Sequence, residues 1–364
     1  MVAMAIAEGV KSVYPDCNIS CIPVADGGEG TVDALVEATK GQILQVDSVD
    51  ALLRPIRSFI GILGDEKTAV IEIAAASGLG LIHHSDRNPL ITSTYGTGIL
   101  IRNALERGFQ NIIIGIGGSA TNDGGMGMAA ALGYKFLDKK GKEVSHGGGN
   151  LRNIYSIDNS GVMPELKNAK FIVACDVINP LCGPQGASAV FGPQKGATPE
   201  MVDELDAGLQ HFAGIIKETL GKDILDIPGS GAAGGLGGGL LAFTSSALRP
   251  GFEIVKEITK LEQRIREADL VFTGEGKIDF QTQFGKTPYG VARIAKEYQK
   301  PVVVLAGTIG EGADILLNLG VSAMFSIANR PMTLEESIKQ APALLKNTTA
   351  QVMRMVFLRL KKLK

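Results

Sequence analysis

Short apolar runs rich in β-branched residues alternate with amphipathic stretches of helical spacing along the sequence, and this alternation most constrains the fold. It is typical of βαβ units, in which helices cover a mostly parallel sheet, so we predict an α/β protein. The expected strands are Ile19–Val24, Ala69–Ile73, Asn111–Ile116, Lys170–Ala174, Leu270–Thr273, Pro301–Ala306 and Ala323–Ile327. The expected helices are Thr31–Ala38, Gly98–Arg107, Met126–Leu132, Pro199–Thr219, Tyr289–Tyr298, Asp314–Leu319 and Leu334–Lys362.

The chain of 364 residues is long enough for two or three domains. From Leu270 onward the order is strand, glycine loop, helix, strand, glycine turn, helix, strand and long helix, which is typical of half a doubly wound domain. Longer glycine-rich loops fill the middle of the chain, roughly Asn88 to Gly251. This change along the chain predicts a separate, inserted domain.

Charge, hydropathy and cysteines exclude several classes of protein. The net charge is -2 and the one basic cluster is Leu358–Lys364, so we expect no nucleic-acid partner. No apolar stretch approaches the ~18 residues of a membrane span. The start, Met1–Val10, lacks the basic region of a signal peptide, and the four cysteines form no CxxC pair. These features predict a cytoplasmic protein with reduced thiols and no membrane partner. We expect either a monomer or a homodimer.

The 47 glycines are the second informative feature, because many of them lie in loops that follow strands or precede helices. Backbone N–H groups in such loops and at helix N-termini bind anions, phosphate above all. One such loop, Gly115–Gly125, follows an apolar strand, and another, Gly229–Gly234, precedes a helix. The candidate phosphate-binding residues are Gly117, Gly118, Ser119, Thr121, Asn122, Gly231, Gly234 and Gly235.

The first of these loops also contains a G-x-G-x-x-A pattern over Gly115–Ala120, with Asp138 further along the chain. The pattern matches the dinucleotide-binding fingerprint, but the match is weak in a chain so rich in glycine. It keeps an NAD(P)-dependent oxidoreductase open as an alternative function.

Two lysines lie on loops just before predicted helices, Lys195 ahead of Pro199 and Lys286 ahead of Tyr289. Either could act as a point charge on a transferring phosphoryl group. The stretch around Lys286 resembles the end of a Walker A motif, but Phe280 stands where that motif requires its first glycine, so it is not a P-loop.

Acidic residues stand at the ends of several predicted strands. Asp176 ends one apolar run, Glu275 and Asp279 follow another, and Asp26 and Glu29 lie between a strand and a helix. Carboxylates in such places can coordinate Mg²⁺, orient a hydroxyl or accept its proton. Together with the lysines and the glycine loops, they indicate a phosphate-handling site.

Several long stretches resemble the bacterial glycerate kinase family, type 1, and the similarity covers essentially the whole chain. These stretches are Val24–Ala34, Ala69–Leu79, Arg87–Leu90, Gly115–Gly125, Phe191–Ala197 and Gly274–Asp279. The resemblance implies ATP-dependent phosphorylation of D-glycerate with Mg²⁺, with 2-phosphoglycerate favoured over 3-phosphoglycerate as the product.

The resemblance also implies a particular architecture. It predicts two α/β domains with the active site in the cleft between them. One is a flavodoxin/Rossmann-like parallel sheet built from both chain ends, residues 1–80 and 255–364, and the other is the inserted domain, residues 81–254.

The family pattern begins with a short strand and an Asp-Ser-Phe-Lys segment, ahead of the helix that corresponds here to Met4–Val13. Roughly the first twenty residues of the pattern are therefore expected to be missing, including a core strand whose loss would expose a sheet edge. We expect low activity as a consequence.

The mechanism implied by the family is direct in-line transfer of the γ-phosphoryl group of ATP to a glycerate hydroxyl. Lys195 and Lys286 would neutralise the developing charge, and Asp176 or Asp279 would accept the hydroxyl proton, with the choice open. The candidate metal ligands are Asp123 and Glu275, and the candidate substrate ligands are Asp26, Glu29, Arg54 and Arg87. A non-catalytic protein that binds a phosphorylated ligand is a further alternative.

Overall fold

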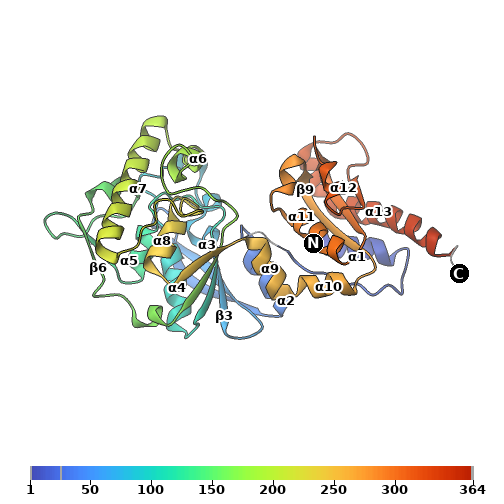
Figure 1. The fold of residues 1–364 in the computed structure, drawn as a ribbon, viewed down its shortest axis with the longest axis horizontal. Coiled ribbons are helices and arrows are strands. Elements are labelled where there is room, and N and C mark those ends of the chain that lie inside the picture. Colours follow the sequence, from blue (N-terminus) through green and yellow to red (C-terminus); the bar gives the residue numbers. More distant parts are fainter. Residues whose placement is uncertain (1, 25–26, 362–364) are drawn as a thin grey trace. The chain divides into compact units, whose positions relative to one another are not determined.

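The computed structural model describes residues 2–24 and 27–361, with the backbone alone described for 357–361 (Figure 1). The chain divides into two compact units. The first unit combines Met1–Val24 with Val255–Lys364, and the second comprises Ala25–Ile254. One unit is therefore formed by both chain ends, and the other is inserted between them.

The N-terminal boundary between the units differs from the one expected from the sequence. Residues 25–80 lie in the second unit rather than in the first. The reason is strand pairing, because β3 (Thr68–Glu72) forms a parallel pair with β4 (Asn111–Gly115). A boundary at residue 80 would cut through this sheet.

The second unit is organised around a six-stranded mixed sheet. Its first three strands pair antiparallel, and the third strand and the three that follow it pair parallel. The β1–β2 hairpin is missing from the sequence prediction, because solvent-facing residues such as Gln45 and Asp47 interrupt the apolar run that marks a buried parallel strand. In spatial order the strands are β1 (Gln42–Val49), β2 (Pro55–Ile62), β3, β4, β7 (Lys170–Ala174) and β8 (Ser246–Arg249).

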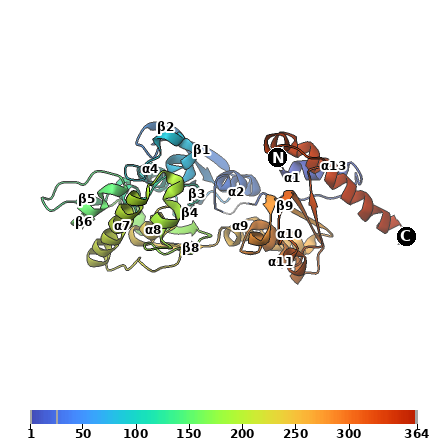
Figure 2. The same cartoon turned by 90° about the horizontal axis from the view of Figure 1, so that it is seen from above.

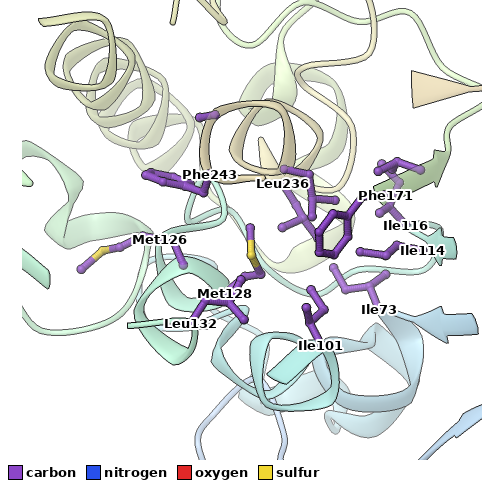
Figure 3. Close-up of a cluster of buried hydrophobic side chains, with 14 of the residues drawn as sticks. Ile73, Ile101, Ile114, Ile116, Met126, Met128, Leu132, Phe171, Leu236 and Phe243 are labelled. Carbon is purple, nitrogen blue, oxygen red and sulfur yellow. The ribbon is translucent and has the colours of Figure 1, made fainter. Parts of the chain in front are cut away.

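Helices and a large apolar core cover this sheet. In Figure 3, Ile114 of β4 and Phe171 of β7 lie close to Ile101, Met128 and Leu236, which come from three different helices. A separate small hairpin pairs β5 (Lys135–Leu137) with β6 (Ser156–Asp158). The helices of the unit are α2 (Thr31–Thr39), α3 (Ala74–Ser77), α4 (Tyr95–Glu106), α5 (Met126–Ala131), α6 (Ala187–Phe191), α7 (Pro199–Leu220) and α8 (Leu236–Phe243). Short 3₁₀ turns are η1 (Leu79–Leu81), η2 (His84–Asp86), η3 (Gly148–Asn153), η4 (Pro164–Lys167) and η5 (Pro193–Lys195).

Helix α7 has capping residues at both of its ends. The hydroxyl of Thr198 caps its N-terminus by accepting from the Met201 N–H, and Pro199 occupies the first turn. Gly221 ends the helix in the left-handed conformation, with φ of 69°. The expectation of a helix from Pro199 is confirmed.

The first unit contains a three-stranded parallel sheet in the order β11-β10-β9. On one face, Ala5 of α1 packs with Leu344 and Val352 of α13, and Figure 2 shows these two helices side by side. The approach is close, because a Cβ on Gly9 would lie 2.5 Å from the Lys346 carbonyl oxygen. The elements are α1 (Val2–Lys11), α9 (Gly251–Thr259), which crosses the boundary, α10 (Leu261–Glu267), β9 (Val271–Ile278), η6 (Phe280–Gln283), α11 (Thr287–Glu297), β10 (Val302–Ile309), α12 (Ile315–Asn318), β11 (Ala323–Ser326) and α13 (Leu334–Lys361).

Two strand predictions in this unit need correction. The segment Ile19–Val24 is irregular rather than a strand. Strand β9 does not end at Thr273 but continues to Ile278, pairing with β10 through the glycines that were expected to form a loop. Glycine is needed there for close strand approach, since a Cβ on Gly274 would lie 2.2 Å from the Leu305 carbonyl oxygen. The other expected strands and helices are confirmed, with shifted ends, except that Lys362, the expected end of the last helix, lies outside the described residues.

In the described part of the chain, no helix combines the length and the apolar character needed to cross a membrane.

Candidate functional site

The carboxyl edge of the parallel strands in the second unit gathers most of the predicted site residues. Strands β3, β4, β7 and β8 run in the same direction, so they end at the same edge. Ligands of open α/β sheets bind outside this edge. The β4 loop, which we define as residues 116–125, leaves the sheet here, and Asp176 follows the end of β7.

The β4 loop is held in place by backbone contacts on two sides. The N–H of Gly117 donates to the Gly27 carbonyl oxygen at 3.3 Å, and the N–H of Ala120 donates to that of Ser77 at 2.9 Å. A Cβ on Gly117 would lie 2.7 Å from the Cα of Gly28. Two glycine motifs far apart in the sequence therefore lie against each other, which the sequence did not predict.

Lys195 is the buried cation of this site. Its side chain is 1% exposed, and its ammonium donates to the Ser119 hydroxyl at 2.9 Å and to the Thr121 carbonyl oxygen at 2.7 Å. Burial lowers the pKa of Lys195 from 10.5 to about 7, and the charge of Asp123 partly opposes this shift. Both acceptors are uncharged, so neither of them neutralises the ammonium when it is protonated.

The turn that carries Lys195 requires a glycine. Gly196 has φ of +93°, and a Cβ there would lie 2.4 Å from the Arg87 carbonyl oxygen. The Arg87 guanidinium donates weakly to the Gln194 carbonyl oxygen at 3.5 Å. The structure thus brings together Arg87 and Lys195, which the sequence analysis singled out separately.

Asp123 has a structural role that does not favour the metal site expected for it. The residue is fully buried, and its carboxylate accepts from the N–H groups of Thr94 at 2.8 Å and of Gly125 and Gly127 at 3.2 Å. The Thr94 hydroxyl also lies 3.0 Å from it, and that hydroxyl accepts from the Met128 N–H. Asp123 therefore caps α5 and ties it to the segment before α4.

The second glycine loop packs against the first. The N–H of Gly124 donates to the Gly234 carbonyl oxygen at 3.0 Å. A Cβ on Gly234 would lie 1.9 Å from the Thr121 carbonyl oxygen, and one on Gly231 would lie 2.1 Å from that of Pro180. Gly235 likewise approaches Gly124. Gly234 and Gly235 thus serve the close packing of the two loops, and Gly231 packs against the backbone at Pro180.

Several buried polar atoms of these loops lack a protein partner in the described part of the chain. They include the hydroxyl of Thr121, the side-chain carbonyl oxygen of Asn122 and the hydroxyl of Ser230. The Asn122 amide nitrogen does have a partner, since it donates to the Ser188 hydroxyl at 3.0 Å. Buried polar atoms without hydrogen bonds are costly, and they suit a polar ligand or water.

The remaining predicted residues of this unit differ in their surroundings. The Arg54 guanidinium already pairs with Asp50 at 2.6 Å and lies 3.6 Å from Asp86. Glu29 is exposed just before α2, whereas Asp26 lies outside the described residues. Asp176 is exposed, and its carboxylate accepts from the Gly251 N–H at 2.9 Å, which anchors the start of α9.

The other predicted charges cluster at the end of β9 in the first unit. The Lys286 ammonium lies 3.1 Å from Glu275, and that of Lys277 lies 2.9 Å from Asp279. The hydrogen bond from Lys277, together with the Gln281 N–H, lowers the pKa of Asp279. This cluster is a set of ion pairs on a partly exposed surface.

Glu275 is the carboxylate with capacity for a cation. One of its oxygens pairs with Lys286, whereas the other is buried without a hydrogen-bond partner among the described residues. Within that same part of the chain, no group of three or more histidine, cysteine or acidic side chains could hold a metal. Mg²⁺ needs no such group, since it is commonly bound by one or two carboxylates and substrate phosphates.

Glu72 is a residue that the sequence analysis missed. It ends β3, is 3% exposed, and accepts from the Val32 N–H at 2.6 Å. Burial raises the pKa of its carboxyl group, with smaller contributions from Asp33 and Glu29. The available signal was a lone carboxylate inside the apolar run Ala69–Ile73.

Comparison with known proteins identifies relatives along nearly the whole chain. The model of the glycerate kinase family matches residues 1–357. The chain is 50% identical to a glycerate kinase of Haemophilus influenzae, over 98% of this chain and 94% of that protein. It is 49% identical to a glycerate 2-kinase of Escherichia coli, over 93% of this chain and 89% of that protein.

A solved structure is also similar. It is the crystal structure assigned to glycerate kinase 2 of Salmonella typhimurium LT2, with a TM-score of 0.89 and 48% sequence identity. The match covers 99% of this chain and 94% of that one. The chain belongs to the glycerate kinase family.

Proposed function

We propose that this chain transfers the γ-phosphoryl group of ATP to D-glycerate and that the product is 2-phosphoglycerate. The observation that carries the proposal is Lys195, a buried ammonium fixed on the Ser119–Thr121 segment at the carboxyl edge of the sheet. A buried cation beside a glycine-rich loop suits an anionic substrate group. The glycerate kinases and the glycerate 2-kinase at about half identity support the choice of substrate and product.

The β4 loop is the proposed phosphate site. Its backbone N–H groups at Gly118 and Ser119, with the side chains of Thr121 and Asn122, would surround the phosphoryl oxygens, whereas the Gly117 N–H donates to the Gly27 carbonyl oxygen. Lys195 would neutralise charge there, acting in part through the Ser119 hydroxyl that it touches. The glycines of the second loop support this arrangement from behind through backbone packing.

Asp176 is the proposed general base. Asp279 is the weaker candidate, because its hydrogen bond with Lys277 lowers its pKa. In the proposed step the glycerate hydroxyl gives its proton to Asp176, and its oxygen forms a bond to the γ-phosphorus. The bond between that phosphorus and the bridging oxygen of ADP breaks at the same time. Arg87 is the proposed partner of the glycerate carboxylate.

Glu275 is the proposed ligand of Mg²⁺, because one of its oxygens is buried without a partner in the described chain. The ion would neutralise charge on the phosphates when bound. Lys286 holds the other Glu275 oxygen at 3.1 Å and would orient the carboxylate.

We also infer that the three-stranded parallel sheet of the first unit belongs to a flavodoxin-like domain. Its strands are covered by helices and all run in one direction, as that fold requires.

An assay that couples ADP formation to NADH oxidation, with and without D-glycerate, tests the proposal. We expect turnover that depends on both substrates, and a ³¹P NMR spectrum of the product that matches 2-phosphoglycerate. Ligand-induced thermal stabilisation without turnover would instead indicate a binding protein. Saturable NAD(H) binding would indicate the oxidoreductase, which is less well supported because the helix after β4 begins only at Met126.

A further inference from the structure

Glu72 occupies a position that links two functional loops. It is the last residue of β3, and its sheet partner is Gly115, the last residue of β4. The β4 loop therefore starts directly beside it. On its other side lies the N-terminus of α2, which follows the segment containing Glu29.

The N-terminus of α2 has no cap of its own. Gly30 occupies the capping position with φ of 90°, and it has no side chain that could accept a hydrogen bond. Glu72 supplies the missing acceptor from forty residues further along the chain, at 2.6 Å from the Val32 N–H. The Gly30 N–H donates to the same carboxylate. A carboxylate at this end of a helix is favoured by both the hydrogen bonds and the helix dipole.

The segment just before α2 lies on the β4 loop. The Gly27 carbonyl oxygen accepts from the Gly117 N–H, and a Cβ on Gly115 would lie 2.6 Å from that oxygen. A shift at the start of α2 would thus be transmitted to the backbone of the β4 loop, since no side chain separates the two.

We propose that Glu72 is a positioning residue that fixes the Gly27–Glu29 segment against the β4 loop and so sets the affinity of the enzyme for its anionic substrates. This rests on the function proposed above. Glu72 touches neither reacting group and acts through the backbone of α2. The charged residues that act on it are both acidic: Glu29 lies just before α2 and Asp33 lies in its first turn.

The test is the E72Q variant, which keeps the shape of the side chain but replaces the charge and turns one acceptor into a donor. We expect KM for ATP or D-glycerate to rise about tenfold or more with a smaller change in kcat, because small displacements of binding groups are costly. Hydrogen exchange at the amides of Val32 and Gly117 should quicken about tenfold. E72D, which keeps the charge, should recover part of both effects.

The matched control is D65N. Asp65 caps the turn before β3, accepting from the N–H groups of Lys67 and Thr68 at 2.9 Å, so the same chemical change falls at the opposite end of the same strand. We expect unchanged KM values in D65N. A folded E72Q protein with wild-type KM and unchanged exchange at Gly117 would overturn the proposal. The exchange measurement needs no turnover, so it still tests Glu72 if the wild-type protein lacks glycerate kinase activity.

Discussion

Lys195 and Lys286 share one sequence signal, a lysine beside a glycine just before a helix, and the structure gives them opposite surroundings. Lys195 is 1% exposed and bound to two uncharged oxygens. The Lys286 side chain is 42% exposed and pairs with Glu275. Burial of a charge without a counter-ion is unfavourable, whereas an exposed ion pair costs little and stabilises little. The contrast supports the proposed role of Lys195 in binding an anionic group.

Two glycines, one from each region, differ in the same way. In the second unit, Gly234 has a left-handed backbone and no room for a Cβ beside the Thr121 carbonyl oxygen. In the first unit, Gly276 of β9 has no atom within 4 Å of the place that a Cβ would occupy. The loops of the second unit are therefore held by tight backbone packing at Gly234, whereas the cluster on β9 consists of paired side chains that are partly exposed.

The largest expected effect separates the two candidate bases, one in each region. D176N should lower kcat about thousandfold with the fold intact, because general base catalysis contributes on this order. The amide oxygen can still accept from the Gly251 N–H. D279N should lower kcat about tenfold or less, since Lys277 already holds that carboxylate. Steady-state kinetics with circular dichroism of both variants measures this.

Near-normal turnover of D176N would remove Asp176 from the role. A thousandfold loss in D279N alone would transfer the role to the first unit.

The second effect concerns stability. G234A should lower the free energy of unfolding by about 3 kcal/mol, because a Cβ would meet a backbone oxygen and φ is +69°. G276A should change it by less than about 0.5 kcal/mol, as a substitution at an open site does. Urea denaturation of the two variants gives both values. An equal loss of free energy of unfolding in both variants would show that the difference in packing at the two glycines does not affect stability.

The sequence was sufficient for the identity of most strands and helices, since their hydrophobic periodicity is local. It also singled out the β4 loop, because its glycines follow an apolar strand, and Lys195, because it lies on a glycine loop before a helix, but their roles in binding stay predictions. It did not predict the extension of β9 through Gly274 and Gly276, whose glycines also suit a loop. Strand pairing across the sheet decides such cases, and pairing is not local.

The chemistry of individual site residues was harder to predict. Asp123 reads as a ligand in a polar loop, yet its oxygens are taken up by backbone N–H groups that come close only in the folded chain. Arg54 is similarly occupied by Asp50. Glu72 escaped notice because its partner, the uncapped start of α2, is distant in sequence. Burial and hydrogen-bond partners decide these roles, and residue type alone predicts neither of them.

The third prediction compares the two lysines directly. K195M should lower kcat/KM about a hundredfold, the usual loss when one donor to a developing oxyanion is removed. K286M should lower it about tenfold or less, because water can replace an exposed ammonium. K217M, which removes an exposed lysine paired with Asp223, is the control and should behave as wild type. An equal loss in K195M and K286M would contradict the contrast drawn from burial.

The smallest effect is the pH dependence of stability that Lys195 contributes. Its pKa is about 7 in the folded protein and near the ordinary 10.5 in the unfolded chain. Between these values the unfolded state binds the extra proton, so stability rises with pH. Between pH 7 and pH 9 this group therefore raises the free energy of unfolding by about 2 kcal/mol.

Urea denaturation of the wild type and K195M at pH 7, 8 and 9 gives the free energy of unfolding of each protein. The change with pH in the difference between the two values measures the effect of Lys195. We expect the wild type to gain about 2 kcal/mol relative to K195M across this range. The difference between the wild type and K217M should stay constant over the same range. The hydrogen bond with Asp223 raises the pKa of Lys217, so the wild-type lysine keeps its proton in both the folded and the unfolded state. A constant difference for K195M as well would mean that Lys195 keeps its full charge in the folded protein, with the ammonium stabilised as well as in water.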